Sequence, residues 1–456
     1  MLKRQISMVL FFILCLTLPL TVFGASLDEV RDIVNDNYVG DINGDVNSAK
    51  SIQELMNMLD PYSTYFTADE FDNFINGVEL TSVGIGVVIE KVEAGIKITQ
   101  LIDGGSAKSA GLKVGDIITA IEDTSTTVLT IDQASSRIKG AENTSVSLTL
   151  LREDGSILKK KLLRKAFSLP NVETKLLYGS VGYISLNSFS NDTASLVSKA
   201  IRDLTGKGAK SFILDLQNNG GGYVTAAEQL IGMFPNASYA YKLKENGGTS
   251  TVRSLKQSVT FPENTKVLVN ELSASASEMT AAALLDQKSA TLYGQTTYGK
   301  GAMQAFFELE DGTFIKLTVG HFYGPSNTTI NHVGVKPNVT TKGNPLFKAH
   351  YDAIAASLIN YKEIDSLKNV PLNKTFTINF SRKLATTVDP TAIQLVELGG
   401  NVVESSFKLS GQQLFVTPNA SLAAGKEYAL LIHPKIKAAT GKGLKTGVYL
   451  HITATK

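Results

Sequence analysis

The 456-residue sequence predicts a multidomain protein with an α/β core, helices before the core and an all-β domain at the C-terminus. Three observations predict this architecture. Apolar residues recur at helix spacing between residues 26 and 74, and strand-like and helical segments alternate between residues 168 and 345. After residue 366, short strand-like segments are separated by Gly, Pro and Asn. Alternating strands and helices are typical of a layered α/β core.

Residues 1–24 have the pattern of a targeting segment. Lys3 and Arg4 precede an apolar stretch over residues 8–23, and Val22 and Gly24 are small residues at the positions that signal peptidases require. We predict a secretory signal peptide cleaved after Gly24, and therefore an exported protein, either extracellular or in the cell envelope. The alternative is an uncleaved anchor, but the stretch is shorter than the ~20 residues that span a membrane.

Composition restricts the partners of the exported chain. Cys15 is the only cysteine and lies in the predicted signal peptide, so the mature chain would have no disulfides. Removal of Lys3 and Arg4 takes the formal charge from +2 to about zero, which argues against a nucleic-acid partner. The five histidines are scattered without metal-ligand spacing, so neither a metal nor a cofactor is expected.

Residues 25–74 are predicted to form a helical region. Leu27, Val30 and Val34 recur at helix spacing, and Thr67 with Glu70 has the spacing of a capping box that starts a further helix.

Residues 75–167 are predicted to form a small domain that binds peptides. Its first strand follows a glycine-kinked turn, which can direct backbone N–H groups at a carboxylate while the strand edge accepts a peptide. The predicted peptide-binding residues are Val83, Gly84, Ile85, Gly86 and Val87. The motif GSAKSAGLKVGDII from Gly105 resembles PDZ domains of bacterial proteases, which are α+β domains, with Ile131–Ile138 as the groove helix. Where those proteases often have arginine after this helix, Lys139 stands here, with Arg137 nearby.

The α/β core at residues 168–345 contains a candidate nucleophile. An apolar segment, Val267–Val269, leads to the sequence SASASE and then to a run of good helix formers. The spacing of Ser275 and Glu278 fits a capping box, which places Ser275 at a helix N-terminus, where an oxyanion is stabilised. Lys300 lies between two glycines 25 residues further on and is a candidate base. A single capping serine is usually structural, so the combination carries the prediction.

The motifs SASASE and TTYGKGAMQ together resemble the signature of the carboxy-terminal (tail-specific) processing peptidases. The resemblance implies a crotonase-like core and a Ser-Lys dyad, in which Ser275 is the nucleophile, Lys300 the base and Gln304 the residue that orients Lys300. Tyr298 stands where the family usually has phenylalanine. The phrase DLQNNGGG, which ends at Gly222, is similar to the family's DLRNNPGG and implies that the N–H groups of Gly221 and Ala276 form the oxyanion hole.

Two other residues in the core are less suited to catalysis. His321 would allow a Ser-His pair, but it lies in a strand-like segment, Phe314–Tyr323, and the dyad is favoured. Asp286 follows Ser275 by eleven residues and is interpreted as structural, because it lies late in the helix.

Residues 346–365 are predicted to form a terminal helix and linker, with the helix extending from Pro345 to Tyr361. Residues 366–456 are predicted to form an all-β sandwich. Its expected strands are Thr375–Phe380, Ala392–Leu398, Gln413–Thr417, Tyr428–Ile432 and Gly447–Thr453. Segments such as Phe376–Ser381 resemble bacterial Ig-like domains of surface and envelope proteins. The resemblance implies a binding or spacing role, with the cell wall or envelope as the contact to consider.

The sequence therefore predicts a serine endopeptidase that cleaves unfolded or C-terminally tagged proteins, with the PDZ domain recognising substrate. Its partners would be proteins or peptides with accessible C-termini, and a homodimer is the assembly to test. The alternative is a catalytically inactive PDZ/Ig-like binding or scaffold protein of the envelope.

Overall fold

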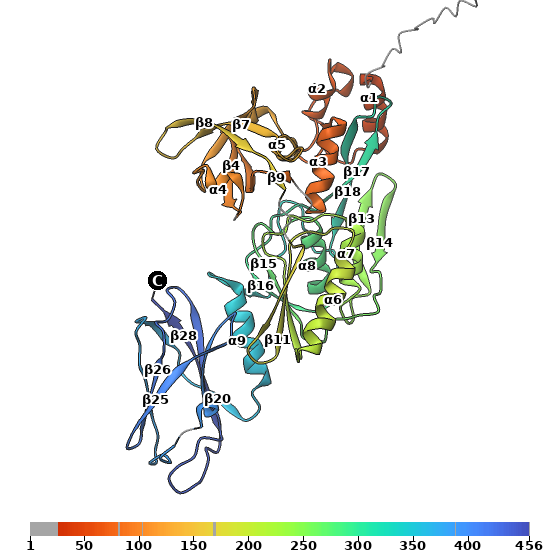
Figure 1. Cartoon of the computed structure of the whole chain (residues 1–456). Coiled ribbons are helices and arrows are strands. Elements are labelled where there is room, and N and C mark those ends of the chain that lie inside the picture. The colour runs from red at the N-terminus through yellow and green to blue at the C-terminus, as the bar shows by residue number, and fades with distance from the viewer. Residues whose placement is uncertain (1–25, 81–82, 103, 167–169, 388, 456) are drawn as a thin grey trace, which may run out of the picture.

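The computed structural model describes residues 26–80, 83–102, 104–166, 170–387 and 389–455. The signal peptide predicted for residues 1–24 lies outside them. The α/β core lies in the middle of the molecule, with the N-terminal helices and the PDZ domain at one end and the all-β domain at the other (Figure 1). Among the helices in these ranges, none combines the length and the apolar character needed to cross a membrane.

The N-terminal region is helical, as the periodicity predicts. It contains α1 (Leu27–Asn37), α2 (Ile52–Met56), β1 (Thr64–Phe66) and α3 (Ala68–Val78). The capping box of Thr67 and Glu70 at the start of α3 is confirmed. Helix α3 continues to Val78, past the predicted boundary at residue 74. Val30 and Leu55 of the first two helices share a buried cluster with Leu317 of the core, so this region is part of the core's packing.

The PDZ domain is a six-stranded sheet with a helix across it. Strands β3, β4, β5, β7 and β8 follow one another in the sheet, and β6 pairs with β5. The bounds are β3 (Val87–Val92), β4 (Gly95–Leu101), α4 (Ser106–Ser109), β5 (Ile117–Ile121), β6 (Thr124–Ser125), α5 (Ile131–Ile138), β7 (Ser145–Leu151) and β8 (Ile157–Leu163). The predicted groove helix is confirmed as α5. A short ribbon of β2 (Val83–Gly84) and β9 (Lys165–Ala166) closes the domain at its base.

The core sheet brings three loops to one edge. Its order is β10 (Val172–Leu177), β11 (Val181–Leu186), β12 (Ser211–Asp215), β15 (Lys266–Val269), β16 (Thr291–Gly294) and β19 (Val339–Thr340). All pairs except β10–β11 are parallel. Parallel strands end at the same edge of a sheet, so the loops after β12, β15 and β16 lie together. These loops contain Gly221, Ser275 and Lys300.

Helices α6 (Thr193–Gly206), α7 (Val224–Ile231) and α8 (Ala276–Asp286) pack on the sheet around a large apolar cluster. Helix α8 is buried along most of its length, because small Ala residues allow close approach.

A second sheet adjoins the core. It contains β17 (Ala302–Glu308), β18 (Phe314–Tyr323), β13 (Tyr239–Glu245) and β14 (Gly248–Arg253), with β1 at its edge. Strand β18 has the bounds that the sequence predicts. It pairs with β1 and with β17, so it joins the N-terminal region to the strand that follows Lys300.

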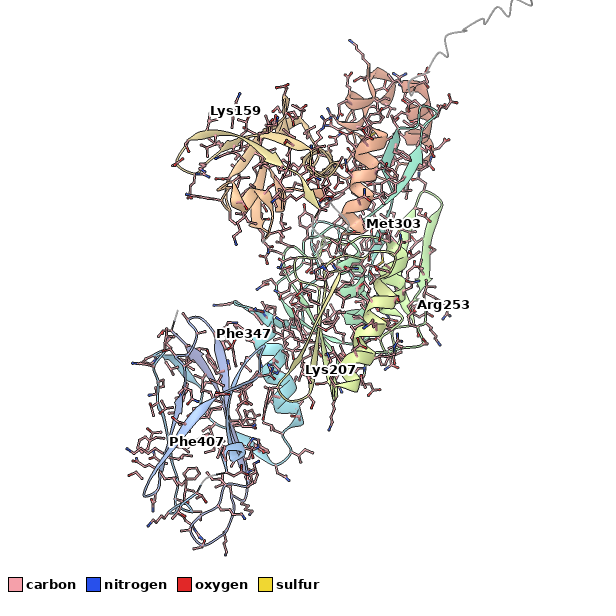
Figure 2. All side chains as sticks on the ribbon, in the orientation of Figure 1. Lys159, Lys207, Arg253, Met303, Phe347 and Phe407 are labelled. Carbon is pink, nitrogen blue, oxygen red and sulfur yellow. The ribbon has the colours of Figure 1, made fainter. Side chains whose placement is uncertain are left out.

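The terminal helix α9 (Pro345–Ser357) ends four residues earlier than predicted. The Ig-like domain follows as two sheets that enclose their own apolar cluster. Its strands are β20 (Tyr361–Glu363), β21 (Leu367–Val370), β22 (Phe376–Asn379), β23 (Ile393–Glu397), β24 (Val402–Val403), β25 (Ser405–Ser410), β26 (Gln413–Pro418), β27 (Glu427–Ile432) and β28 (Gly447–Ala454). The five strands predicted there are confirmed as β22, β23, β26, β27 and β28, and the sequence did not indicate β20, β21, β24 or β25. Side chains of both domains meet around Phe347 of α9 (Figure 2).

Candidate active site

Ser275 is the N-cap residue of α8, as the capping-box spacing predicts. Its backbone has φ +55° and ψ −111°. A positive φ is uncommon for a residue with a side chain and costs free energy that the surrounding structure must supply. The sharp turn leaves the side chain at the pocket surface and the first N–H groups of α8 beside it.

The other two serines of SASASE fix the nucleophile loop to its neighbour. Ser273 Oγ donates to the carbonyl of Leu216 (2.8 Å), and Ser277 Oγ donates to the carbonyl of Asn219 (2.8 Å). Ser273 and Ser277 are fully buried, whereas Ser275 is partly exposed. The motif therefore contains one accessible serine between two structural ones.

Glu278 links the nucleophile to the base loop. Its carboxylate accepts hydrogen bonds from the N–H of Ser275 (2.9 Å), the N–H of Gly299 (2.6 Å), the N–H of Lys300 (2.8 Å) and the hydroxyl of Thr297 (2.6 Å). Glu278 is fully buried. Burial raises the pKa of Glu278, although the hydrogen bonds act in the opposite sense. One carboxylate thus sets the spacing of Ser275 and Lys300.

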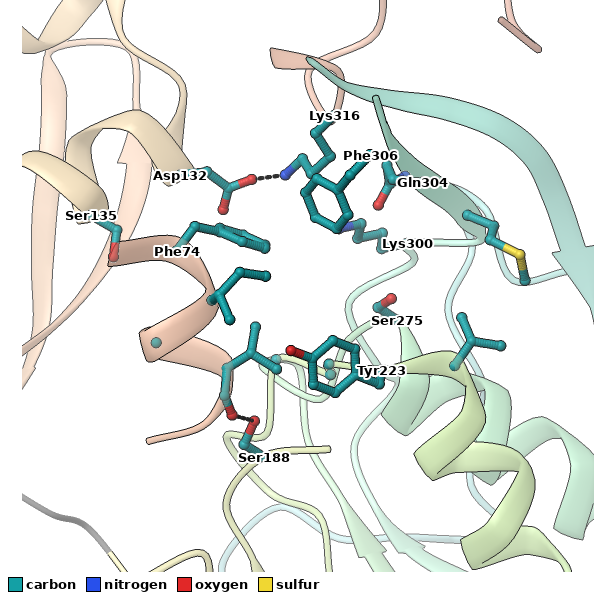
Figure 3. A pocket seen from close by; sticks show the side chains of 18 of the residues that line it. Phe74, Asp132, Ser135, Ser188, Tyr223, Ser275, Lys300, Gln304, Phe306 and Lys316 are labelled. Carbon is teal, nitrogen blue, oxygen red and sulfur yellow. Dashed lines mark hydrogen bonds and ion pairs between the residues drawn. The ribbon is translucent and has the colours of Figure 1, made fainter. Parts of the chain in front are cut away.

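The Lys300 side chain points into the same pocket (Figure 3). The pKa of Lys300 is lowered to about 8, first by burial and then by the charge of Lys316, while Asp132, Asp60 and Glu278 act to raise it. The ammonium lies 4.9 Å from the ring centroid of Tyr62. Within the described residues no hydrogen bond joins it to Ser275 Oγ. A lysine with this pKa is partly neutral near pH 8 and can then accept a proton.

Gln304 lies in the pocket, but its amide has another partner. Its Nε2 donates to Thr318 Oγ1 of β18 (3.2 Å). In the described part of the chain it makes no hydrogen bond to Lys300. The orienting role implied by resemblance remains a prediction.

The two predicted oxyanion donors flank Ser275. Ala276 is the first residue of α8, so its N–H lies outside the helical hydrogen-bond ladder. A side chain on Gly221, which has φ +105°, would meet Ser275 Cβ at 2.9 Å, so only glycine allows this approach. The N–H of Gly221 donates to Asn219 Oδ1 (2.9 Å) in this arrangement.

The pocket around Ser275 has a volume of about 340 Å³. The apolar part of its wall includes Phe74, Ile75 and Val78 from α3 and Met303 and Phe306 from β17. Phe71 joins this wall to β18 by stacking on Phe314, with ring centroids 3.8 Å apart. His321 does not line the pocket. In the described ranges, no group of three or more His, Cys, Asp or Glu residues could hold a metal ion.

Asp286 has the structural role that its position predicts. Its carboxylate accepts from the N–H of Ser326 (2.8 Å) and from the hydroxyl of Thr328, so it ties the end of α8 to the loop after β18.

The sequence did not assign three charged residues to the pocket, which are Asp132 and Lys139 from the PDZ domain and Lys316 from β18. Lys139 was singled out only as the residue that stands where related proteases often have arginine. Lys316 is 3% exposed and forms an ion pair with Asp132. Its ammonium also lies 4.9 Å from the ring centroid of Phe74. The signal available in the sequence was Lys316 between the apolar residues Ile315 and Leu317 of a predicted strand.

The predicted peptide-binding turn of the PDZ domain lies between β2 and β3. Gly86 has φ +79°, and its carbonyl accepts from Ile102 N–H (3.0 Å). The side chain of Ile85 is 1% exposed in the PDZ core, so only its backbone can face a peptide. Val83 and Gly84 pair with β9, and Val87 begins β3.

Comparison with known proteins defines the class. Residues 180–341 match peptidase family S41, residues 97–152 match the PDZ domain, and residues 357–452 match the bacterial Ig-like domain. The chain is a serine-type peptidase with two accessory domains.

Two relatives show which family the chain belongs to. A Staphylococcus aureus (strain MRSA252) protein named "Probable CtpA-like serine protease" is 32% identical over 367 residues, 79% of this chain and 70% of that protein. A protein of the same name from Staphylococcus haemolyticus is 30% identical over 386 residues, 84% of this chain and 73% of that protein. This chain therefore belongs to peptidase family S41, the carboxy-terminal processing serine proteases.

A solved structure supports the fold. The photosystem II D1 C-terminal processing protease aligns with 72% of this chain and 95% of its own, with a TM-score of 0.57 and 22% sequence identity.

Proposed function

We propose that this peptidase is an exported endopeptidase that cleaves unfolded or C-terminally tagged proteins through a dyad of Ser275 and Lys300. The observation that carries the proposal is the Glu278 carboxylate, which accepts hydrogen bonds from the backbone N–H groups of both residues at the edge of one pocket. The same proposal includes a crotonase-like core, export of the chain and recognition of substrate by the PDZ domain.

In the proposed reaction, neutral Lys300 removes the proton of Ser275 Oγ as the oxygen attacks the scissile carbonyl. Lys300 then gives this proton to the leaving amine, and water hydrolyses the acyl-enzyme with Lys300 again acting as the base. The N–H groups of Ala276 and Gly221 stabilise the oxyanion. For this, Gly221 N–H must share or leave its bond to Asn219, and Gln304 orients the Lys300 amine.

Catalysis also requires a change at Lys300, because its ammonium lies against Tyr62 and is not bonded to Ser275. Catalytic hydrogen bonds often tighten only in the substrate complex. We infer that the arrangement is a resting one and that peptide binding to the PDZ domain favours the active one. A ligand shifts such an equilibrium only if it binds the two arrangements with different affinity.

Casein digestion tests the proposed function. Wild type should cleave unfolded casein, and Ser275→Ala should lose at least about a thousandfold in rate while remaining folded, because nucleophile and base act as one unit. Lys300→Arg should be equally inactive, since a guanidinium does not lose its proton. Substantial cleavage by either purified variant would contradict the dyad.

A further inference from the structure

The Ig-like domain has an open apolar groove between its two sheets. The groove has a volume of about 670 Å³ and lies between β22, an edge strand of one sheet, and β27 and β28 of the other. Its lining includes Leu430, Ile432 and Leu450, which are 2%, 5% and 5% exposed and belong to the apolar cluster of the domain. Side chains of the domain's own core thus line a cavity of the size that ligands occupy.

Exposed apolar side chains stand at the rim of this groove. Ile364, which precedes β21, is 42% exposed, and Leu367, the first residue of β21, is 39% exposed. The charged residues that line the groove are Asp365 and Lys374, so their formal charges cancel. An apolar groove that remains open to solvent is typical of a binding site for an apolar group.

A basic pocket adjoins the groove. It has a volume of about 300 Å³, and its charged residues are Arg382, Lys442 and Lys445. The residues that line both cavities are Phe380, Ser381 and Leu444. In the described part of the chain, none of the three basic side chains forms a hydrogen bond or an ion pair, and no acidic residue lines the pocket. The pocket therefore presents three cations whose charge the protein does not neutralise there.

The two loops around the basic pocket, residues 381–389 and 433–446, have an excess of positive charge. A β-bridge between Leu384 and Ala438 holds them side by side. Their basic residues are Arg382, Lys383, Lys435, Lys437, Lys442 and Lys445. Their one acidic residue is Asp389, which pairs with Lys435 (3.6 Å) and does not line the pocket. Such a concentration of cations attracts an anion, and arginine and lysine are the residues that bind phosphate oxygens.

We propose that the Ig-like domain binds a single anionic lipid molecule, with the phosphate head in the basic pocket and the acyl chain in the apolar groove. One molecule can fill both cavities, because they share part of their wall. The hydroxyl of Ser381 lies where head and chain would meet. Among the described residues, none lines both this site and the pocket of Ser275, so the proposal goes beyond the peptidase function and does not depend on it.

A lipid fits the two cavities better than a peptide or a free anion does. A peptide in the groove would need partners for its backbone N–H and C=O groups, and β22 offers an edge of four residues, Phe376–Asn379. A free anion would use the basic pocket and leave the apolar groove in contact with water. An acyl chain needs no hydrogen bonds, and its burial releases that water.

The lipid is expected as a single molecule held by the protein, not as part of a bilayer. The groove extends between the two sheets to Leu430 and Leu450, which are almost fully buried. A chain that reaches these residues has to leave the bilayer. The basic residues would otherwise act only as a charged surface, which does not require a groove.

Three probes that contain the head, the chain or both test the site. Monodecanoyl glycerol phosphate has both, glycerol phosphate has only the head, and monodecanoyl glycerol has only the chain. Calorimetric titration of the full mature chain, below the concentration at which the probes form micelles, gives each Kd. The complete probe should bind at least about tenfold more tightly than either part. Replacing its decanoyl chain by octanoyl should weaken binding by up to about fourfold per methylene removed.

Variants of exposed residues assign the binding to each cavity. Lys442→Met should weaken binding of the complete probe about tenfold, the effect of one lost charge-assisted hydrogen bond, and should leave monodecanoyl glycerol unaffected. Lys437→Met is its matched control, because Lys437 is an exposed lysine of the same loop that does not line the pocket. Ile364→Asp should weaken binding of the complete probe and of monodecanoyl glycerol, but not of glycerol phosphate. Ile359→Asp is its control, since Ile359 is 80% exposed and does not line the groove.

The lipid site is wrong if glycerol phosphate binds as tightly as the complete probe, because the groove would then contribute nothing. It is equally wrong if monodecanoyl glycerol does so, because the basic pocket would then contribute nothing. Binding to vesicles of phosphatidylglycerol and phosphatidylcholine without binding of the dissolved probe would instead indicate a membrane-docking surface. Binding of an extended acidic peptide in place of the complete probe would mean that β22 accepts a strand. Failure of the peptidase function would appear separately, as absence of casein cleavage.

Discussion

The two accessory domains contact the peptidase core in different ways. The PDZ domain contacts the N-terminal helical region, which packs on the core, through polar groups of α5. Ser136 Oγ donates to the carbonyl of Glu70 (2.9 Å), Gln133 Nε2 donates to the carbonyl of Tyr65 (3.2 Å), and Arg137 pairs with Glu70 (3.0 Å). The Ig-like domain contacts the core through an apolar cluster. Its buried members are Phe347, Tyr351 and Ile354 of α9 and Val396, Leu398, Ala429 and Leu431 of the Ig-like domain.

This difference indicates which domain can move. Polar contacts between domains exchange readily with water, whereas separation of an apolar interface exposes its surface at about 25 cal/mol per Å². We infer that the PDZ domain can leave its docked position while the Ig-like domain stays attached to α9. The contacts of the PDZ domain also include the ion pair between Asp132 and Lys316 in the catalytic pocket. Movement of the PDZ domain therefore changes the active site directly.

The largest expected effect comes from a charge in the Ig-like junction. Leu398→Asp places a carboxylate at a position with 0% exposure and should destabilise the junction by about 3–5 kcal/mol. Val402→Asp on β24 is the matched control, since Val402 is 43% exposed, and should have little effect. The stability of both variants is measured by urea unfolding, and the opening of the junction is measured by hydrogen exchange of the amides of α9. Unchanged protection of α9 in Leu398→Asp would show that the apolar cluster does not hold the domains together.

A smaller, pH-dependent effect is expected from His350 in the same junction. His350 Nδ1 accepts from Gly399 N–H (2.9 Å), and Nε2 donates to the carbonyl of Tyr178 (2.9 Å), so the neutral ring joins the two domains. Burial lowers the pKa of His350 below its ordinary 6.5. The stabilisation of the folded state by neutral His350 is therefore complete above pH 6.5. As pH falls from 6.5 toward the lowered pKa, the free energy of unfolding decreases by at most about 1.4 kcal/mol per pH unit. His350→Gln should flatten this part of a stability-versus-pH curve, and an unchanged slope would exclude His350 as its source.

The smallest effect is expected at the PDZ junction. Arg137 is 40% exposed, so its pair with Glu70 contributes less than about 1 kcal/mol. If this junction holds the resting arrangement, Arg137→Met should raise basal casein cleavage by up to about fivefold. Lys97→Met is the control, because Lys97 pairs with Glu90 within the PDZ sheet at similar exposure. A fall in rate in Arg137→Met alone would mean that the docked PDZ domain belongs to the active form.

Much of the fold follows from local sequence patterns. Alternation and β-branched residues predict β18 over Phe314–Tyr323, and the capping boxes at Thr67 and Ser275 locate the starts of α3 and α8. Strand β25 was not predicted, because Ser405–Ser410 contains only two apolar residues, Phe407 and Leu409, among three Ser and one Lys. The end of α9 at Ser357 depends on contacts with the Ig-like domain, which local propensity does not include.

A residue of the candidate site could be predicted from the sequence where it lies within a recognisable motif. Ser275 and Lys300 lie in motifs, and the structure brings both into one pocket. Lys139 and Asp132 were not assigned to it, because they reach the pocket only through docking of a separate domain. The contacts of Glu278 with the Lys300 loop span 22 residues and depend on the parallel order of β15 and β16.

The pH dependence of covalent labelling at Ser275 tests the central claim that neutral Lys300 activates this serine. With a fluorophosphonate probe, the labelling rate of wild type should rise about tenfold per pH unit below pH 8 and become constant above it, since the pKa of Lys300 is lowered to about 8. Lys300→Ala should label at a rate near background at every pH. A wild-type rate that does not change between pH 6 and 9, or equal labelling of Lys300→Ala, would contradict the Ser275–Lys300 dyad.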